Sequence, residues 1–194
     1  MSEHRDRSWT TGAAEVESPA VHVASFTELA SVVAYRLWRL RIAVFVVEQQ
    51  CPYQELDGRD IEPTTRHVWT TVGDEPIGCL RILAEPDGAA RIGRVCVRSD
   101  ARGTGLAEVL MRAALNVVGD RASVLDAQTR LGRWYARFGY ETSGAEFEED
   151  GIPHLPHASP SRLTSAATGR QEKSMSNPSS GDGRKAAGAG CLGA

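Results

Sequence analysis

The chain has 194 residues, of which 41% are hydrophobic and 24% are charged, a composition that suits one globular domain with attached segments. Its formal net charge of -3 excludes a general nucleic-acid footprint, and the lack of a long uncharged apolar run excludes a transmembrane helix. The four cysteines contain no Cys-x-x-Cys pair, so neither a zinc site nor a thioredoxin motif is indicated, and a cytoplasmic protein with reduced thiols is expected.

The N-terminal part predicts a short strand and one long helix. Residues 1–20 are polar and aperiodic, which is typical of a disordered leader. Residues 21–24 alternate like a strand, and Ser25 and Glu28 then fit a capping box, whose two side chains satisfy backbone N–H groups reciprocally. Apolar residues at helical spacing follow, so we expect a helix that reaches the region of Val46.

Three strands in an antiparallel meander are predicted next. The loop 51–60 contains Pro52, which forbids continuation of the helix, and we expect this loop to be too polar for the core. Residues 66–72 and 77–83 read as two strands of a hairpin, joined by a Gly-Asp-Glu-Pro turn. A second turn leads into a short, β-branched apolar strand that includes Ile92.

A glycine-rich turn within residues 94–107 joins this strand to the next helix. Such a turn lets the backbone approach an anion closely, and the first N–H groups of the helix lack intrahelical partners. The arrangement therefore predicts a phosphate site. Two common phosphate motifs do not fit, because no lysine or Ser/Thr follows Gly105 as in Walker A, and Glu108 replaces the third glycine of the dinucleotide fingerprint.

The remaining elements complete an alternating α/β order. A helix follows the turn over 106–117, and a buried strand over 123–128 is expected to run parallel to the strand before the turn, across a right-handed crossover. A short amphipathic helix over 131–138 ends at Gly139, where a left-handed C-cap belongs. The final strands are expected at residues 140–143 and 147–157.

Four stretches give the chain a family resemblance. Arg102-x-x-Gly105-x-Ala107 resembles the Arg/Gln-x-x-Gly-x-Gly/Ala signature of the GNAT N-acetyltransferases, and residues 134–140 look like the family's Tyr-x-x-Leu/Phe-Gly-Phe/Tyr segment. Residues 40–58 and 148–154 are similar, nearly letter for letter, to the ElaA-like branch of that family. The resemblance implies one GNAT domain over residues 21–157.

The C-terminal residues 158–194 fall outside this resemblance. They are rich in Ser, Gly and Ala, keep no apolar period and are expected to form a disordered tail. The ElaA-like branch usually ends soon after its last strand with an apolar residue, whereas here Leu155-Pro-His-Ala-Ser leads into the tail. We therefore expect the last strand to be shorter or weaker at its end.

The resemblance implies both a fold and an activity. The fold is the α/β GNAT (acyl-CoA N-acyltransferase) fold, with a mixed, mostly antiparallel sheet splayed between strands four and five and flanked by helices. The activity is direct transfer of the acetyl group of acetyl-CoA, without a metal, to a primary amine of an unidentified small molecule or peptide. The alternative is a non-catalytic acyl-CoA-binding regulatory module of the same fold. The oligomeric state is left open, a homodimer included.

The donor site follows from the same resemblance. The family wraps the acetyl-CoA pyrophosphate with the glycine-rich turn, which here consists of Arg102, Gly103, Thr104, Gly105, Leu106 and Ala107. A plain helix start is the alternative for this turn. Backbone groups of Val95, Cys96 and Val97 are expected to hold the pantetheine arm and polarise the thioester carbonyl. For Cys96 we weigh an acyl-carrying nucleophile against a small buried residue, and we expect the latter.

The proton-transfer groups are less well defined. Tyr135 falls where the family has the phenol that protonates the departing CoA thiolate, and a phenol with a pKa of about 10 suits that task; a core aromatic is the alternative. The general base that takes a proton from the amine is Glu48, His67 or His154, and each of these residues could instead have a purely structural role. Six acidic loop residues either attract a cationic amine or form a solvated face: Glu55, Asp57, Asp60, Glu148, Glu149 and Asp150.

Overall fold

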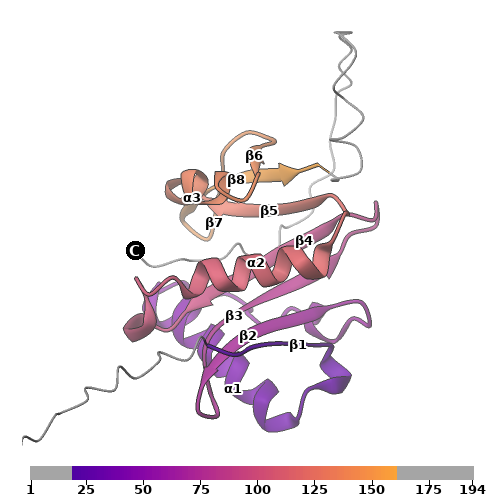
Figure 1. Ribbon diagram of the computed structural model, residues 1–194. Coiled ribbons are helices and arrows are strands. Elements are labelled where there is room, and N and C mark those ends of the chain that lie inside the picture. Colours follow the sequence, from indigo (N-terminus) through magenta and orange to yellow (C-terminus); the bar gives the residue numbers. More distant parts are fainter. Residues whose placement is uncertain (1–18, 161–194) are drawn as a thin grey trace, which may run out of the picture.

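One mixed sheet organises the molecule (Figure 1). The computed structural model describes residues 19–160, in which eight strands lie in the order β1-β2-β3-β4-β5-β8-β6, with β7 paired to β8. The strands are β1 (Val21–Ala24), β2 (Arg66–Val72), β3 (Glu75–Ala84), β4 (Ala90–Val97), β5 (Ser123–Gln128), β6 (Glu141–Thr142), β7 (Phe147–Glu149) and β8 (Ile152–Ser159). The predicted α/β class with a mostly antiparallel sheet is confirmed. Nearly all of the predicted leader and tail lies outside the described residues.

The parallel pair β4–β5 is splayed. The two strands pair only at their N-terminal ends, Ala90 with Ser123 and Arg91 with Val124, and then part (Figure 1). Arg94 explains the divergence, because its φ of 54° is left-handed and the register between β3 and β4 shifts near it. A bulge of this kind bends the strand and interrupts its pairing. The predicted splay between strands four and five is therefore confirmed.

Helices cover both faces of the sheet. The helix α1 (Ser31–Arg41) packs on β3, and α2 (Leu106–Val118) packs on β2, β3 and β4 from the opposite face. The short helix α3 (Gly132–Ala136) lies against β5 and β6. Among residues 19–160, no helix combines the length and the apolar character that crossing a membrane requires.

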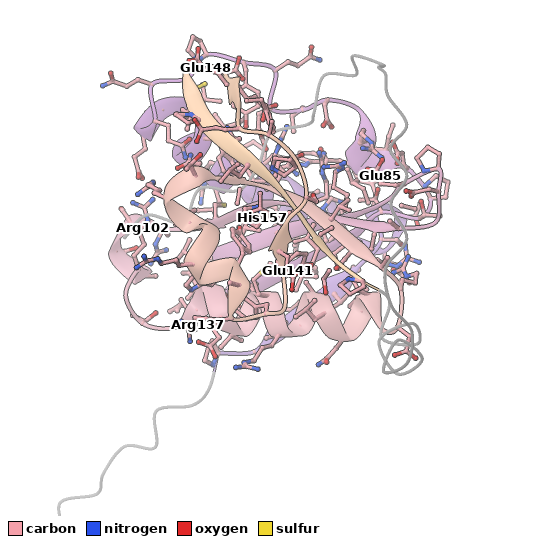
Figure 2. All side chains as sticks on the ribbon, turned by 90° about the horizontal axis from the view of Figure 1, so that it is seen from above. Glu85, Arg102, Arg137, Glu141, Glu148 and His157 are labelled. Atoms are coloured by element: carbon pink, nitrogen blue, oxygen red, sulfur yellow. The ribbon has the colours of Figure 1, made fainter. Side chains whose placement is uncertain are left out.

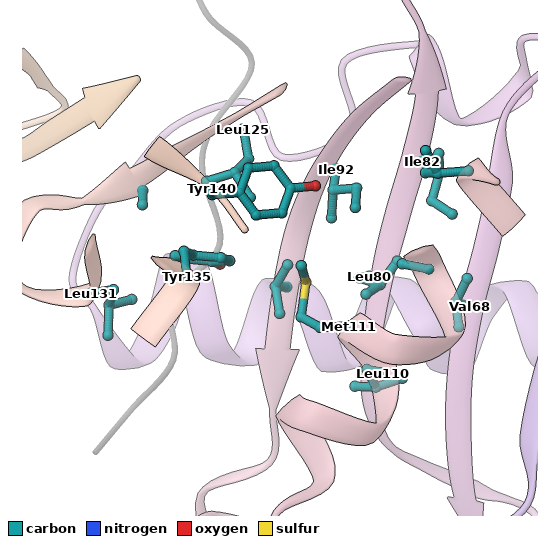
Figure 3. Packing of buried hydrophobic residues seen from close by; sticks show 14 of the residues in the cluster. Val68, Leu80, Ile82, Ile92, Leu110, Met111, Leu125, Leu131, Tyr135 and Tyr140 are labelled. Atoms are coloured by element: carbon teal, nitrogen blue, oxygen red, sulfur yellow. The ribbon is translucent and has the colours of Figure 1, made fainter. Parts of the chain in front are cut away.

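The core is divided into two clusters, because successive strand residues point to opposite faces. Val95 and Val97 of β4 belong to the larger cluster under α2, whereas Cys96 belongs to the smaller cluster under α1. The larger cluster continues to α3, where Tyr135 and Leu131 pack (Figure 3). Its α2 side is a stripe at helical spacing: Leu106, Leu110, Met111, Ala114 and Val118.

The first helix differs from its prediction at both ends. The capping box is present, and the Ser25 N–H donates to the Glu28 carboxylate at 2.7 Å, but it caps a 3₁₀ turn, so α1 begins only at Ser31. After Arg41 the chain continues as a π-helix over Ile42–Glu48. π-helical turns are rare and often lie at functional sites, so this segment is a reason to look for a pocket nearby.

The last strand is longer than predicted. β8 pairs with every residue of β5 and ends at Ser159, where Ser159 lies opposite Ser123. The expectation of a short or weak end is therefore wrong. The pairing with β5 explains the difference, because it satisfies backbone groups along the whole strand whatever the side chains are.

The prediction for the loop 51–60 is also wrong, because this loop contributes charged groups to the core. Glu55 and Asp60 are 3% and 4% exposed, and both bind the buried Arg41. Glu55 also accepts an ion pair from Arg94 at 2.7 Å. A buried carboxylate is tolerated where it is paired in this way.

Arg81 completes this group, which we call the arginine network: Arg41, Arg81, Arg94, Glu55, Asp57 and Asp60. Arg81 donates two hydrogen bonds of 2.8 Å to Asp57 and lies 3.1 Å from Asp60. Burial alone would raise the pKa of Asp57, but the bonds from Arg81 outweigh it and lower the pKa to about 2. The three carboxylates therefore form neither a solvated face nor a site for a cationic amine, which corrects both interpretations.

Candidate active site

The glycine-rich turn lines a pocket of about 290 Å³ between the end of β4, the start of α2 and α3. We call it the loop pocket. Its walls are apolar at Val97, Leu106, Leu131 and Trp134, and charged at Arg102, Glu108 and Arg137. Gly103, Gly105, Ala101 and Ala107 supply its backbone wall. The structure thus brings together five of the six predicted turn residues on one surface.

The turn leaves backbone donors available. Gly103 and Gly105 have φ values of 74° and 87°, a left-handed conformation that favours glycine, and Gly105 is the N-cap of α2. In the described part of the chain, the N–H groups from Gly103 to Ala107 donate to no other backbone group. The Thr104 hydroxyl donates to the Ala101 carbonyl at 2.7 Å, which fixes the turn. The pocket therefore has the donors that an anion at a helix N-terminus requires.

Arg102 and Glu48 form a bidentate ion pair at the rim of this pocket. The two nitrogen–oxygen distances are 2.6 and 2.8 Å, and Arg102 Nε also donates to the Val97 carbonyl at 3.0 Å. The bond from Arg102 lowers the pKa of Glu48, so this carboxylate holds a proton poorly. Glu48, at the end of the π-helix, thereby links the α1 face to the turn.

Arg137 is a pocket residue that sequence reasoning missed. It lies on the same side of the molecule as Arg102 (Figure 2) and pairs with Glu108 of α2 at 2.8 Å. Glu108 in turn binds Arg112 at 2.7 Å. Arg137 could have been noticed from the sequence, because it lies within residues 134–140, the segment that resembles the family, directly before Phe138.

Cys96 is a packed strand residue. It is 0% exposed, and its sulfur lies 3.6 Å from that of Cys79 on the neighbouring strand. The contact with Cys79 and the burial raise the pKa of the Cys96 thiol. A thiolate nucleophile at this position is disfavoured, because both effects favour the protonated form. The backbone of β4 beyond Arg91 has no partner in β5, so its polar groups face the splay.

Tyr135 lies behind the wall of the loop pocket. Its side chain is 1% exposed and packs edge-on against Trp134, with ring centroids 4.8 Å apart. It also packs edge-on against Tyr140, with ring centroids 6.3 Å apart, and both tyrosines lie in the cluster drawn in Figure 3. Leu131 and Trp134, which flank it on α3 and the preceding turn, form the wall. Tyr135 thus belongs to the core on the α2 face, adjacent to the pocket lining and not part of it.

A second, much smaller cavity of about 20 Å³ lies under the π-helix, and we call it the acidic pocket. It contains Glu149 and Asp150 from the β7–β8 turn and has no arginine or lysine in its described lining. Asp150 and Gly151 have φ values of 51° and 81°, which is the type I′ turn of a tight hairpin. The rest of its lining is Phe45, Gln49, Cys51, Tyr53, Gln128, Ile152 and His154.

His154 lines this pocket with a neutral imidazole ring. Its Nδ1 lies 2.8 Å from the Ile152 carbonyl, which can only accept, so Nδ1 carries the proton and Nε2 keeps a lone pair. Burial lowers the pKa of His154 and keeps the ring neutral near pH 7. No hydrogen bond of Nε2 is found within the residues that the structure describes.

The other predicted groups lie elsewhere. His67 is buried, its Nε2 lies 3.1 Å from the Asp60 carbonyl, and burial lowers its pKa, so it supports the arginine network. Glu148 is exposed on β7, away from Arg102 and Arg137 (Figure 2). Over the described stretch of the chain, no group of His, Cys, Asp and Glu is arranged to hold a metal ion.

The two pockets lie at the same end of the sheet but on opposite faces. Leu125 and Ala127 of β5 point into the cluster under α2, so Gln128, one residue further, points to the α1 face. His154 is the β8 partner of Gln128 and therefore shares its face. The C-terminal ends of β4 and β5, where the strands are parted, separate the loop pocket from the acidic pocket.

Comparisons with known proteins agree with this geometry. A family model described as "Acetyltransferase (GNAT) domain" matches residues 30–159. The UPF0039 protein Rv2851c of Mycobacterium tuberculosis is 48% identical over 130 residues, which cover 65% of this chain and 83% of that protein. Protein ElaA of Escherichia coli is 39% identical over 135 residues, which cover 66% of this chain and 88% of that protein.

Solved structures extend the likeness to three dimensions. Escherichia coli ElaA superposes with a TM-score of 0.70 at 36% identity, over 73% of this chain and 99% of that chain. An acyl-CoA N-acyltransferase from Pseudomonas aeruginosa gives a TM-score of 0.69 at 36% identity, with the same coverage of 73% and 99%. The chain therefore belongs to the GNAT family of acyltransferases and, within it, to the ElaA-like branch.

Proposed function

We propose that this protein transfers the acetyl group of acetyl-CoA directly to a primary amine of a small molecule or peptide. The observation that carries the proposal is the parting of β4 from β5 after two residue pairs, with a pocket on each face at the end where they part. A thioester entering from one face would then meet an amine from the other. Transfer depends on this positioning and on polarisation of the carbonyl.

The loop pocket suits the donor. The pyrophosphate of acetyl-CoA would accept hydrogen bonds from the N–H groups of residues 103–107, next to the guanidinium groups of Arg102 and Arg137. The pantetheine arm would lie along the unpaired edge of β4 from Val95 to Val97, whose backbone N–H groups would polarise the thioester carbonyl.

The acidic pocket suits the acceptor. The amine nitrogen would attack the carbonyl carbon, forming the C–N bond, and collapse of the tetrahedral intermediate would break the C–S bond. The nitrogen becomes strongly acidic as it bonds to carbon, so neutral His154 is basic enough to take its proton at Nε2. Tyr135, which lies directly behind Leu131 and Trp134, would give its phenolic proton to a CoA sulfur that reaches between these two side chains, and would regain a proton through the pocket once CoA leaves.

The geometry favours His154 over Glu48 as the base. Glu48 is held by Arg102 and its pKa is lowered, whereas His154 Nε2 has a lone pair at the pocket wall. In this proposal Glu48 positions Arg102 and the phosphate turn. It also ties the π-helix on the acceptor side to the donor site.

The test uses the full-length protein with acetyl-CoA and a panel of amines, amino acid amides, peptides and polyamines. Release of CoA thiol, together with a mass increase of one acetyl group on the amine, supports the proposal. Tight acetyl-CoA binding without any acetylated product would instead support the alternative, a non-catalytic acyl-CoA-binding module of the same fold. Release of thiol without acylated amine would indicate a hydrolase and would contradict both.

A further inference from the structure

Gln49 is a half-buried side chain whose amide nitrogen is buried, and the proposed mechanism does not use it. It follows the π-helix directly and lines the acidic pocket. Its side-chain Nε2 is fully buried and, within residues 19–160, has no hydrogen-bond partner. A buried donor without an acceptor is costly and is usually satisfied in the working state of a site. Gln49 therefore indicates that something with an acceptor atom enters this pocket.

The rest of the pocket indicates a cation. Glu149 and Asp150 are carboxylates, and His154 offers the lone pair of Nε2. A primary ammonium group has three N–H donors, which these acceptors match in kind. The cavity of about 20 Å³ has room for one group the size of a water molecule, which an ammonium group fills, so the rest of the ligand must lie at the mouth of the pocket.

These two requirements must be met by one small ligand. Gln49 and the acceptors line the same cavity, so an oxygen that reaches Gln49 must lie close to the ammonium nitrogen. We propose that the acceptor is a primary amine with a hydroxyl or carbonyl oxygen on the second carbon from nitrogen, as in amino alcohols and α-amino amides. This inference rests on the proposed function and narrows the substrate class of the same site.

The experiment compares three small probes of similar size with the full-length protein and acetyl-CoA. Ethanolamine and glycinamide carry the oxygen, and n-propylamine replaces it with a methyl group. We expect kcat/KM, expressed per concentration of the ammonium form that the pocket binds, to be about tenfold or more higher for the two oxygen-bearing probes, because n-propylamine leaves Gln49 unpaired. Equal values for ethanolamine and n-propylamine would overturn the inference and leave the acetyltransferase proposal standing.

Gln49→Met tests the residue itself, because Met keeps the unbranched length and removes the amide. The expected result is that the ratio of kcat/KM for glycinamide over n-propylamine falls toward one. Gln49→Glu, which keeps the shape and replaces the donor by an acceptor, should lower the same ratio. The matched control is Gln54→Leu, since Gln54 is exposed in the neighbouring loop and its amide bonds the Leu56 carbonyl. A preserved ratio in Gln49→Met would contradict the inference.

Binding measurements separate this inference from the proposed reaction. Calorimetric titration of glycinamide and n-propylamine into the protein saturated with CoA gives the same comparison without turnover. Preferential binding of glycinamide that Gln49→Met removes, in a protein that acetylates neither, would support the inference and overturn the proposed function. No binding and no turnover of any of the probes would overturn the inference.

Discussion

The loop pocket and the acidic pocket lie at the same end of one sheet and differ in every property that selects a ligand. The loop pocket has about 290 Å³, two arginines and a run of unused backbone N–H groups. The acidic pocket has about 20 Å³, two carboxylates and a neutral histidine. The first fits a large anion and the second fits a small cation. Charge complementarity of this kind sorts ligands before any specific contact forms.

The difference has a structural origin in the way each pocket is built. The loop pocket is formed by local sequence, namely a strand end, a turn with left-handed glycines and the first turn of α2. The acidic pocket is assembled from segments that are far apart, because Cys51 contacts the Asp150 carbonyl at 3.6 Å across about a hundred residues of sequence. The loop pocket therefore depends mainly on one continuous stretch of sequence, whereas the acidic pocket depends on the relative placement of several distant segments.

We expect the largest effect from Tyr135→Phe, which tests whether the phenol behind the wall of the loop pocket acts as the proton donor. If the Tyr135 phenol protonates the CoA sulfur, kcat should fall about 100-fold or more. The KM for acetyl-CoA should change little, because Phe preserves the packing against Trp134. Steady-state kinetics with saturating amine measures both constants. A loss of acetyl-CoA affinity as large as the loss of kcat would assign Tyr135 to packing alone.

His154→Asn, in the acidic pocket, should have the next largest effect. Asn can keep the contact to the Ile152 carbonyl but removes Nε2. We expect kcat/KM for the amine to fall about 100-fold, and the acidic limb that arises from the lowered pKa of His154 to disappear. The matched variant is Glu48→Gln, which weakens the ion pair with Arg102 and should act mainly on the KM for acetyl-CoA. The opposite pattern, with kcat lost in Glu48→Gln and kept in His154→Asn, would make Glu48 the base.

Much of the loop pocket and its surroundings was predictable from the sequence because the signals are local. The apolar spacing of α2, the left-handed Gly139 and the glycines of the phosphate turn each act within a few residues. The full length of β8 was not predicted, because the expectation relied on where the ElaA-like branch usually ends and did not consider pairing with β5.

The arginine network and the acidic pocket were harder to predict because their contacts are non-local. Glu55 and Asp60 are polar by any local criterion, yet Arg81 and Arg94, more than twenty residues away, take them into the core. One signal was available: arginines in the middle of apolar strands need buried partners. No comparable signal marked Gln49, whose role depends on where the β7–β8 turn lies.

Two substitutions, each removing one charge from one pocket, test whether the opposite charges of the two pockets act independently. Arg137→Gln removes a cation from the loop pocket and should raise the KM for acetyl-CoA about fivefold, while the KM for the amine stays the same. Asp150→Asn removes an anion from the acidic pocket and should raise the KM for the amine by a similar factor. Asn tolerates the left-handed φ of 51° at this position, so the turn is preserved. Either variant shifting both constants equally would mean that the pockets are not electrostatically separate.

The smallest expected effect concerns the stability of the folded protein as the pH falls. Burial lowers the pKa of both His154 and His67 in the folded protein, whereas unfolded histidine titrates at about 6.5. Between the lowered value and 6.5 the unfolded chain binds protons that the folded chain does not, so the free energy of unfolding must rise with pH up to about 6.5 and then level off. Each unit of lowering contributes about 1.4 kcal/mol per histidine. Urea unfolding between pH 5 and 8 measures the slope, and His154→Asn should remove its share while His67→Asn removes the rest. An unchanged slope in both variants would mean that the two imidazole rings are solvated in solution. Burial would then not keep His154 neutral, and the argument for His154 as the general base would fail.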